Sequence, residues 1–308
     1  IKLDMKKDWI SVDARLGYED ASLVAKNVVA MIDNKAPLTI VLTAHYDHMG
    51  INGEIYHGAN NNASGVASLL ALAEMIKLNS LKQYNYLFVA LSGSKFNNQG
   101  AVAFLQENSK AAYTFSSLID LNMLGRFNKL IKNLYVAGVG TSKVWGELLT
   151  KNNKGFVLKV DSAGVGYGGY SLFYKKNIPL LSFSTGYNAD YSKPNDDISK
   201  INLASQVDIN NYIYKIISEL DKLPRLSFTE TFNMAEKLEN LKNDLGIIPD
   251  YTFPDNGIRI ATCLTNKLAD KAGLDPDDVI IQIAEFSIID FDDYIDAMNK
   301  LEKGREVP

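Results

Sequence analysis

Runs of apolar and often β-branched residues recur along the first two thirds of the chain, and each is short enough to form one strand. Several of them are apolar on both faces, which is typical of strands in a sheet that is covered on each side. The runs that predict strands are residues 27–33, 38–44, 84–93, 116–124 and 177–186.

Stretches with apolar residues at helical spacing lie between these runs. Ser64 stands where the first helix needs a cap, and Pro224 follows the last helix and ends it. The predicted helices are residues 64–79, 98–110, 141–154 and 203–222. Strands that alternate with helices predict an α/β fold with a largely parallel sheet, and such sheets carry their sites at the carboxyl ends of the strands.

The pattern changes after residue 225, where short apolar runs and turn residues replace the long elements. A charged amphipathic segment at 228–244 comes first, and a helix is predicted at 291–302. We therefore divide the chain into two domains, residues 1–225 and a small β-rich domain at 226–308. The small domain is expected to lack its final strand, so that it is truncated at its C-terminus.

Composition narrows the class of protein. Hydrophobic residues make up 46% of the 308 residues and charged residues 22%, which is ordinary for a globular protein with a large core. The formal charge of -4 gives no reason to expect a nucleic-acid partner, and no apolar run reaches the roughly 20 residues of a membrane span. The single cysteine, Cys263, excludes an internal disulfide. The first residues lack the apolar region of a signal peptide, so we expect a leader to be absent or already removed.

All 3 histidines of the chain lie between residues 45 and 57. His45 and Asp47 directly follow the strand predicted at 38–44, at the end of the sheet where α/β sites form. A histidine with a carboxylate two residues on is a common arrangement of a metal ligand and its orienting partner. On this motif alone, an ordinary loop histidine remains the alternative, with Asp47 bonded to a turn.

Five segments in register make the first domain resemble the co-catalytic zinc aminopeptidase family, whose relatives include glutamate carboxypeptidase and the transferrin receptor ectodomain. The segments are HYDHMG (45–50), GANNNASG (58–65), FVALSGSKFNNQGA (88–101), DLNMLGR (120–126) and TGYNADYSKPNDD (185–197). The resemblance implies a three-layer α/β/α zinc-exopeptidase-like domain with a mixed, largely parallel sheet. The tail, with LGII near its start and KAGLDPDDVIIQI further on, resembles a PDZ domain of the bacterial protease type.

The resemblance also implies a site for two zinc ions, and this chain departs from it at most positions. The first histidine ligand matches His45, and its orienting partner matches Asp47. The general base falls on Ser94. The remaining ligand positions of the family fall on Asn61, Lys95, Asn122 and Ser192.

These replacements exchange four carboxylates for two amides, a hydroxyl and an ammonium group. A lysine ammonium repels a nearby zinc ion, and zinc prefers imidazole, thiolate and carboxylate ligands. We therefore expect no metal, no other cofactor and no functional catalytic residue, and we interpret the chain as a degenerate, non-catalytic aminopeptidase homologue. Lys95 is expected to occupy the space of a metal ion and to pair with Asp47, or with the amides of Asn61 and Asn122.

Other interpretations of the same residues stay open. An active zinc-dependent aminopeptidase with one weakly bound zinc, in a reduced site around His45, is the main alternative. Hydrolysis through Ser94 and Lys95 is a third, although no GxSxG motif accompanies it. Residues 60–62 would equally suit a helix cap, and Lys95 a solvated loop.

The expected partner is a peptide or a protein segment. The PDZ-like domain would bind it by strand addition at Leu245, Gly246, Ile247 and Ile248, whereas the same run also suits a plain first strand. PDZ-bearing relatives of this kind are typically exported in bacteria, and the resemblance thus implies a periplasmic or extracellular location.

Overall fold

The computed structural model describes residues 24–108, 113–166, 168–231, 241–249 and 256–302. A seven-stranded sheet forms the centre of the first domain. Four neighbouring strands are parallel, whereas β1 runs antiparallel to β5 and β7 runs antiparallel to β9. In spatial order the strands are β1 (Val28–Ile32), β5 (Asn85–Leu91), β2 (Thr39–His45), β6 (Phe115–Leu121), β9 (Leu180–Ser184), β7 (Asn133–Ala137) and β8 (Val157–Val160).

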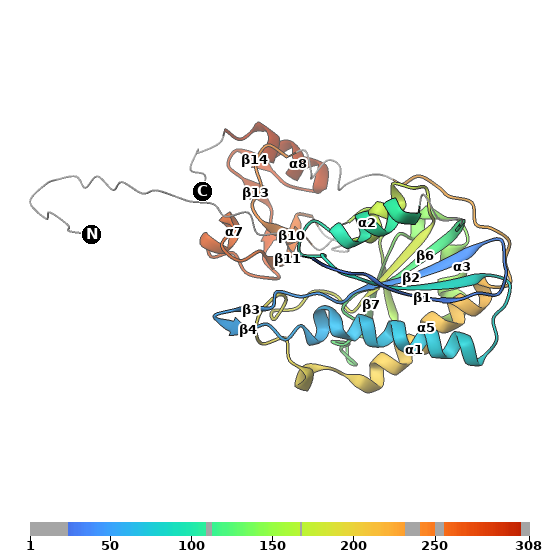
Figure 1. The fold of residues 1–308 in the computed structure, drawn as a ribbon. Helices are drawn as coiled ribbons and strands as arrows, with labels where there is room; N and C mark the ends of the chain where they lie inside the picture. The colour runs from blue at the N-terminus through green and yellow to red at the C-terminus, as the bar shows by residue number, and fades with distance from the viewer. Residues whose placement is uncertain (1–23, 109–112, 167, 232–240, 250–255, 303–308) are drawn as a thin grey trace, which may run out of the picture.

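Helices cover both faces of this sheet (Figure 1). On one face lie α1 (Gly65–Leu78), α3 (Trp145–Asn152) and α5 (Leu203–Leu220), and on the other lie α2 (Gln99–Asn108) and α4 (Tyr170–Tyr174). Alternation along β2 explains the two layers, because Ile40 and Leu42 enter the first core and Val41 enters the second. The predicted three-layer α/β/α domain with a mixed, largely parallel sheet is confirmed.

Short elements connect the main ones. The hairpin of β3 (Ile51–Asn52) and β4 (Glu54–Ile55) follows β2 at the carboxyl end of the parallel strands, and a short π-helical segment, η1 (Ala59–Ser64), leads into α1. Single turns of 3₁₀ helix, η2 (Val139–Thr141) and η3 (Ile198–Lys200), precede α3 and α5. Among the described residues, no helix has both the length and the apolar character that a membrane crossing requires.

The sequence pattern located five strands and four helices of this domain but missed β7, β8 and α4. β7 is only half-buried and β8 lies at the edge of the sheet, so neither shows a continuous apolar run. The expected cap at Ser64 is wrong, because its hydroxyl donates to the carbonyl of Asn60 at 2.8 Å.

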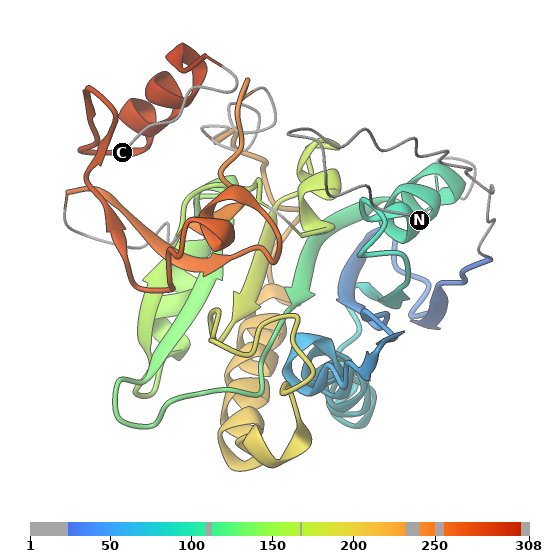
Figure 2. The ribbon, with the colours of Figure 1, turned by 90° about the vertical axis from the view of Figure 1, so that its left-hand side faces the viewer.

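The small domain has its own hydrophobic core and few long elements. Its core gathers Ile258, Ile260, Tyr294 and Met298 with their neighbours. The strands β10 (Ile247–Pro249), β11 (Ile258–Cys263) and β12 (Val279–Ile280) form an antiparallel sheet, β13 (Gln282–Ile283) pairs with β14 (Phe286–Ser287), and the helices are α7 (Leu268–Lys271) and α8 (Phe291–Lys300). Figure 2 shows this domain in front of the carboxyl end of the main sheet. The C-terminal segment, on which the expected truncation of this domain depends, lies outside the described residues, as does the N-terminal segment.

The residues that follow the predicted domain boundary at 225 still pack on the first domain. Leu226 belongs to the first core, and the rings of Phe228 and Tyr174 lie 5.3 Å apart. Thr231 receives a hydrogen bond at its carbonyl from the Tyr174 hydroxyl at 2.8 Å. Residues 226–231 therefore run along the first domain.

Limited proteolysis tests the division into two domains, which remains a proposal. We expect cleavage between residues 231 and 244 to release a compact core that still carries residues 226–231, since these pack on it. Mass spectrometry of the fragments identifies the position of the cleavage site. Resistance to cleavage, together with one cooperative unfolding transition, would contradict the division.

A buried carboxylate ties the end of α5 to the start of β5. Asp221 accepts hydrogen bonds from the Tyr86 hydroxyl at 2.6 Å and from the backbone N–H of Gln83 at 3.1 Å. Lys82 donates a third through its backbone N–H at 3.3 Å. These bonds anchor the loop that leads into the central sheet.

Replacement of Asp221 by Ala should destabilise the fold by about 1–3 kcal/mol, because the buried donors lose their acceptor. Urea unfolding measures the free energy, with Asp208→Ala on the exposed face of α5 as the matched control. The control should change stability by less than about 0.5 kcal/mol. Equal effects of the two variants would show that the network contributes nothing.

Candidate functional site

The carboxyl ends of β2, β5 and β6 open into a cavity of 620 Å³. Parallel strands bring their ends to one edge of the sheet, so residues far apart in sequence meet there. Of the predicted catalytic and metal-ligand positions, all but Asp47 line this cavity: His45, Asn61, Ser94, Lys95, Asn122 and Ser192. Ile248, one of the four predicted peptide-binding residues, lines it from the small domain.

Both ring nitrogens of His45 are engaged by protein groups. Nε2 lies 3.1 Å from Oδ1 of Asn61, and Nδ1 lies 3.1 Å from the main-chain carbonyl of Asp47. The carboxylate of Asp47 is further away, with Oδ1 at 3.7 Å from Nδ1. Burial, with a smaller contribution from the nearby Lys95, lowers the pKa of His45, so the imidazole is neutral at physiological pH.

Ser94 approaches the same ring nitrogen as Asp47. Its hydroxyl oxygen lies 3.2 Å from Nδ1 of His45. A catalytic triad needs the nucleophile and the orienting carboxylate on opposite nitrogens of the imidazole. The observed arrangement thus gives no support to hydrolysis through Ser94.

The three asparagines at 60–62 hold the loop between β4 and α1. Asn62 donates from Nδ2 to the carbonyl of Leu121 at 3.0 Å and accepts from the N–H of Met123 at 2.8 Å. Asn60 accepts from the N–H of Gly125 at 2.9 Å. The interpretation of these residues as a helix cap is wrong, because no side chain caps α1.

Lys95 lines the cavity without the expected ion pair. Its backbone N–H donates to Oδ2 of Asp47 at 3.3 Å, but its ammonium lies over the ring of Tyr191, 5.5 Å from the centroid. No carboxylate oxygen of a described residue comes within 4.0 Å of the ammonium. The predicted side-chain pairing of Lys95 with Asp47 is therefore wrong, and a contact with an aromatic face takes its place.

Two buried carboxylates near the cavity were missed by sequence reasoning. Asp120 accepts from the hydroxyls of Thr43 and Ser182, each at 2.8 Å, and burial raises its pKa. Asp196 accepts from the backbone N–H groups of Asn60 and Asn61 at 3.0 and 2.9 Å. A charged residue within a fully buried strand was the available signal for Asp120, whereas Asp196 is distant in sequence from the loop it holds.

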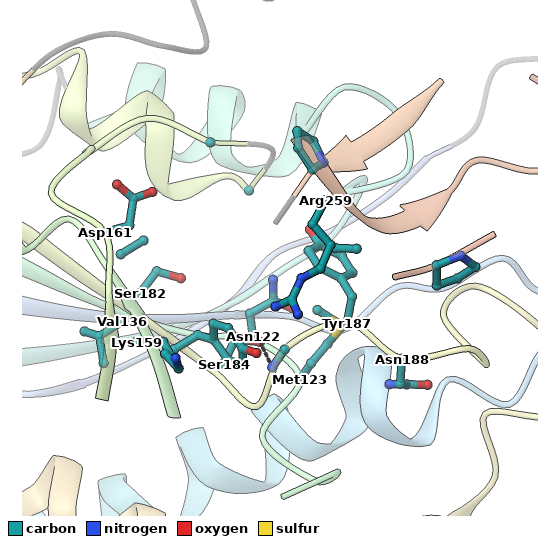
Figure 3. A pocket seen from close by; sticks show the side chains of 18 of the residues that line it. Asn122, Met123, Val136, Lys159, Asp161, Ser182, Ser184, Tyr187, Asn188 and Arg259 are labelled. Atoms are coloured by element: carbon teal, nitrogen blue, oxygen red, sulfur yellow. Dashed lines mark hydrogen bonds between the residues drawn. The ribbon is translucent and has the colours of Figure 1, made fainter. Parts of the chain in front are cut away.

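A second, smaller cavity of 290 Å³ lies beside the first, between the two domains. Figure 3 shows Arg259 of β11 reaching from the small domain toward Asn122 and Tyr187. Lys159 and Asp161 lie on the opposite side of this cavity. The small domain thus supplies a charged side chain to the cleft, which no sequence motif indicated.

The donor set at the sheet edge does not fit zinc. The described residues contain no group of three or more His, Cys, Asp or Glu arranged to hold a metal ion. At the positions expected for ligands, His45 is hydrogen-bonded through both nitrogens and Lys95 presents a cation. Amides and a hydroxyl supply the remaining groups, which zinc binds poorly.

Comparison with known proteins gives relatives that match part of the chain. One relative is the BOS complex subunit NCLN of Gallus gallus, 40% identical over 105 residues that cover 30% of this chain and 18% of that protein. Another is the alkaline phosphatase isozyme conversion protein of Escherichia coli, 29% identical over 116 residues that cover 34% of this chain and 30% of that protein. The chain therefore spans less than a third of the length of either relative.

Solved structures share the fold of the first domain. The LapA aminopeptidase of Legionella pneumophila matches with a TM-score of 0.55 at 19% identity, over 64% of this chain and 56% of that one. A zinc aminopeptidase from Bacillus subtilis matches with a TM-score of 0.54 at 21% identity, over 66% and 53%. The model of Peptidase family M28 matches residues 27–217, which span the whole main sheet and most of α5. The chain belongs to peptidase family M28.

Proposed function

We propose that this chain is a non-catalytic member of its family with a peptide-binding or scaffold role. The observation that carries the proposal is the position of Lys95, whose half-buried ammonium faces the cavity where the family resemblance places a zinc ligand. A cation at that point repels a metal ion and offers no lone pair while it is protonated. The sheet edge keeps its cavity and loses the means to activate water.

A general base is also lacking in a suitable position. Oδ2 of Asp47 accepts from the backbone of Lys95, and Asp120 is held by two hydroxyls. Both ring nitrogens of His48 are buried without a hydrogen-bond partner, and burial lowers its pKa to about 4. A base must reach the proton that it removes. Neither Asp47 nor His48 lines the cavity, and Asp120, which does, is held by its two hydroxyl partners.

The relatives fit a role in protein assembly. The proteins of Gallus gallus and Homo sapiens that match this chain are named as subunits of the BOS complex, at 40% and 42% identity over short regions. Those names support a partner that is a protein segment rather than a small metabolite. Two of the solved structures with the same fold, from Legionella pneumophila and Bacillus subtilis, are named as aminopeptidases, which keeps activity as the competing possibility.

The second candidate function is an active aminopeptidase with one weakly bound zinc at a reduced site around His45. The proximity of Oδ1 of Asp47 to Nδ1 of His45, at 3.7 Å, favours it. His45 would have to release Asn61 to bind the metal ion. This cost, together with the charge of Lys95, makes it the weaker proposal.

For the small domain we propose a PDZ-like peptide-binding role, with Leu245, Gly246, Ile247 and Ile248 as contact residues. Ile247 and Ile248 lie on β10, which has β11 as its neighbour on one side. An edge strand of this kind offers its other side for strand addition. A periplasmic or extracellular location in bacteria, and the absence of a bound cofactor, belong to the same proposal.

Zinc content tests the proposed function directly. We expect the purified chain, dialysed against zinc, to hold well below one zinc ion per molecule by elemental analysis. A double variant, Asn61→Asp with Lys95→Glu, restores two carboxylates and should retain more zinc than the parent chain. Stoichiometric zinc in the parent, lost on His45→Ala, would support the reduced site instead.

Hydrolysis of aminoacyl anilides is the companion test. We expect no release of the aniline above background with added zinc or cobalt, because no base and no metal are in place to activate water. Heat-treated protein supplies the background rate. Turnover that disappears in His45→Ala would overturn the proposal.

The unpaired imidazole of His48 predicts a pH dependence of stability. Its pKa is about 4 in the folded chain against 6.5 for the free side chain, so only the unfolded chain binds the proton between these values. The free energy of unfolding should therefore fall as the pH drops from 6.5 to 4. His48→Gln should flatten this slope, and His57→Gln, at an exposed histidine, is the matched control. Chemical unfolding at a series of pH values measures it, and identical slopes in all three proteins would contradict the prediction.

A further inference from the structure

The larger cavity is completed by the small domain. Ile248 of β10 and the segment Leu264–Asn266 form one wall, and the ends of β2, β5 and β6 form the other. Asn122, Gly168 and Tyr187 line both cavities, so the smaller one beneath Arg259 directly adjoins the larger. The resulting cleft is lined by residues of both domains.

Lys95 gives the larger cavity its positive charge. Among the described lining residues, only Lys95 and Asp120 carry a formal charge once His45 is neutral. Burial lowers the pKa of Lys95, and the nearby charge of Asp47 offsets this only in part. A half-buried cation without a carboxylate partner among the described residues is unfavourable, and an anion supplied by a ligand would stabilise it.

Asp120 does not serve as the partner of Lys95. Its two carboxylate oxygens are occupied by the hydroxyls of Thr43 and Ser182. Burial raises the pKa of Asp120, and the hydrogen bonds from Ser182 and Thr43 offset this in part. A bound ligand would therefore have to supply the negative charge that pairs with Lys95.

Asn122 adds a second, directional requirement. Its backbone N–H donates to the carbonyl of Phe183 at 3.0 Å, which fixes the residue at the end of β6. Its side-chain oxygen is buried without a hydrogen-bond partner, although the residue lines both cavities. A buried acceptor of this kind favours a ligand that brings an N–H group.

Building on the proposed peptide-binding role, we propose that the cleft recognises a peptide carboxylate, with Lys95 binding the carboxylate and Asn122 accepting a backbone N–H beside it. The last residue of a peptide carries both groups at adjacent positions. An aspartate or glutamate side chain within a peptide presents the same carboxylate. The cavity beneath Arg259 receives the adjoining part of the ligand.

Three short peptides distinguish these sources. The probes are acetyl-trialanine with a free carboxylate, the same peptide with a C-terminal amide, and an acetylated, amidated peptide with one central glutamate. Isothermal calorimetry on the whole chain measures their dissociation constants in the millimolar range. We expect the free acid to bind at least about tenfold more tightly than the amide. Binding of the glutamate peptide alone would assign the carboxylate to a side chain.

Variants of Lys95 test the residue itself. Lys95→Gln should weaken binding of the free acid at least about tenfold and leave the weak binding of the amide unchanged. Lys95→Arg should keep the preference, because it keeps the cation. Lys77→Gln, at an exposed lysine of α1, is the matched control. Thermal unfolding confirms that each variant folds, and the free acid should raise the melting temperature of the parent chain more than that of Lys95→Gln.

The outcomes separate this inference from the proposed function. Equal binding of acid and amide, or equal binding of the acid by the parent and Lys95→Gln, would overturn carboxylate recognition while peptide binding without hydrolysis stands. Failure of all three peptides to bind would also overturn it. Release of alanine from any probe would instead refute the non-catalytic role.

Discussion

The buried carboxylate of Asp196 fixes the loops on which the cleft depends. The residue is 1% exposed, and its two oxygens receive the backbone N–H groups of Asn60 and Asn61, while its own carbonyl receives that of Ala59 at 3.0 Å. These bonds turn the asparagine side chains toward β2 and β6, where Asn61 meets His45. A carboxylate that serves backbone donors is satisfied without any metal ion. The geometry of these loops is therefore fixed by hydrogen bonds within the protein.

Burial on both faces explains why most of the main sheet could be predicted from sequence. Runs such as 38–44 and 116–124 had to be strands, and the helices between them forced a parallel order that brings His45 and Asn122 to one edge. β8 was not predicted, because an edge strand needs no continuous apolar run. The placement of the small domain over the cleft was also beyond local patterns, since Arg259 lies in an ordinary alternating strand.

The sequence could indicate which residues lie at the sheet edge, but it could not indicate which groups their side chains contact. Sequence spacing could identify Lys95 and Asp47 as neighbours at the sheet edge, yet the choice between an ion pair and the ring of Tyr191 depends on the direction of a long side chain. The bond from Asn60 to Asp196 joins residues that are 136 positions apart, which no motif specifies. Hydrogen-bond partners of this kind follow from the packed structure, and only their chemical types follow from the sequence.

The contact between Lys95 and Tyr191 has an evolutionary consequence. A single mutation that restored an acidic residue at position 61 would place a carboxylate near a half-buried ammonium, and the two would attract each other instead of binding a cation from solution. Under the proposed non-catalytic role, each family ligand position is thus held in its present state by the others. A change to zinc chemistry would then need several substitutions together.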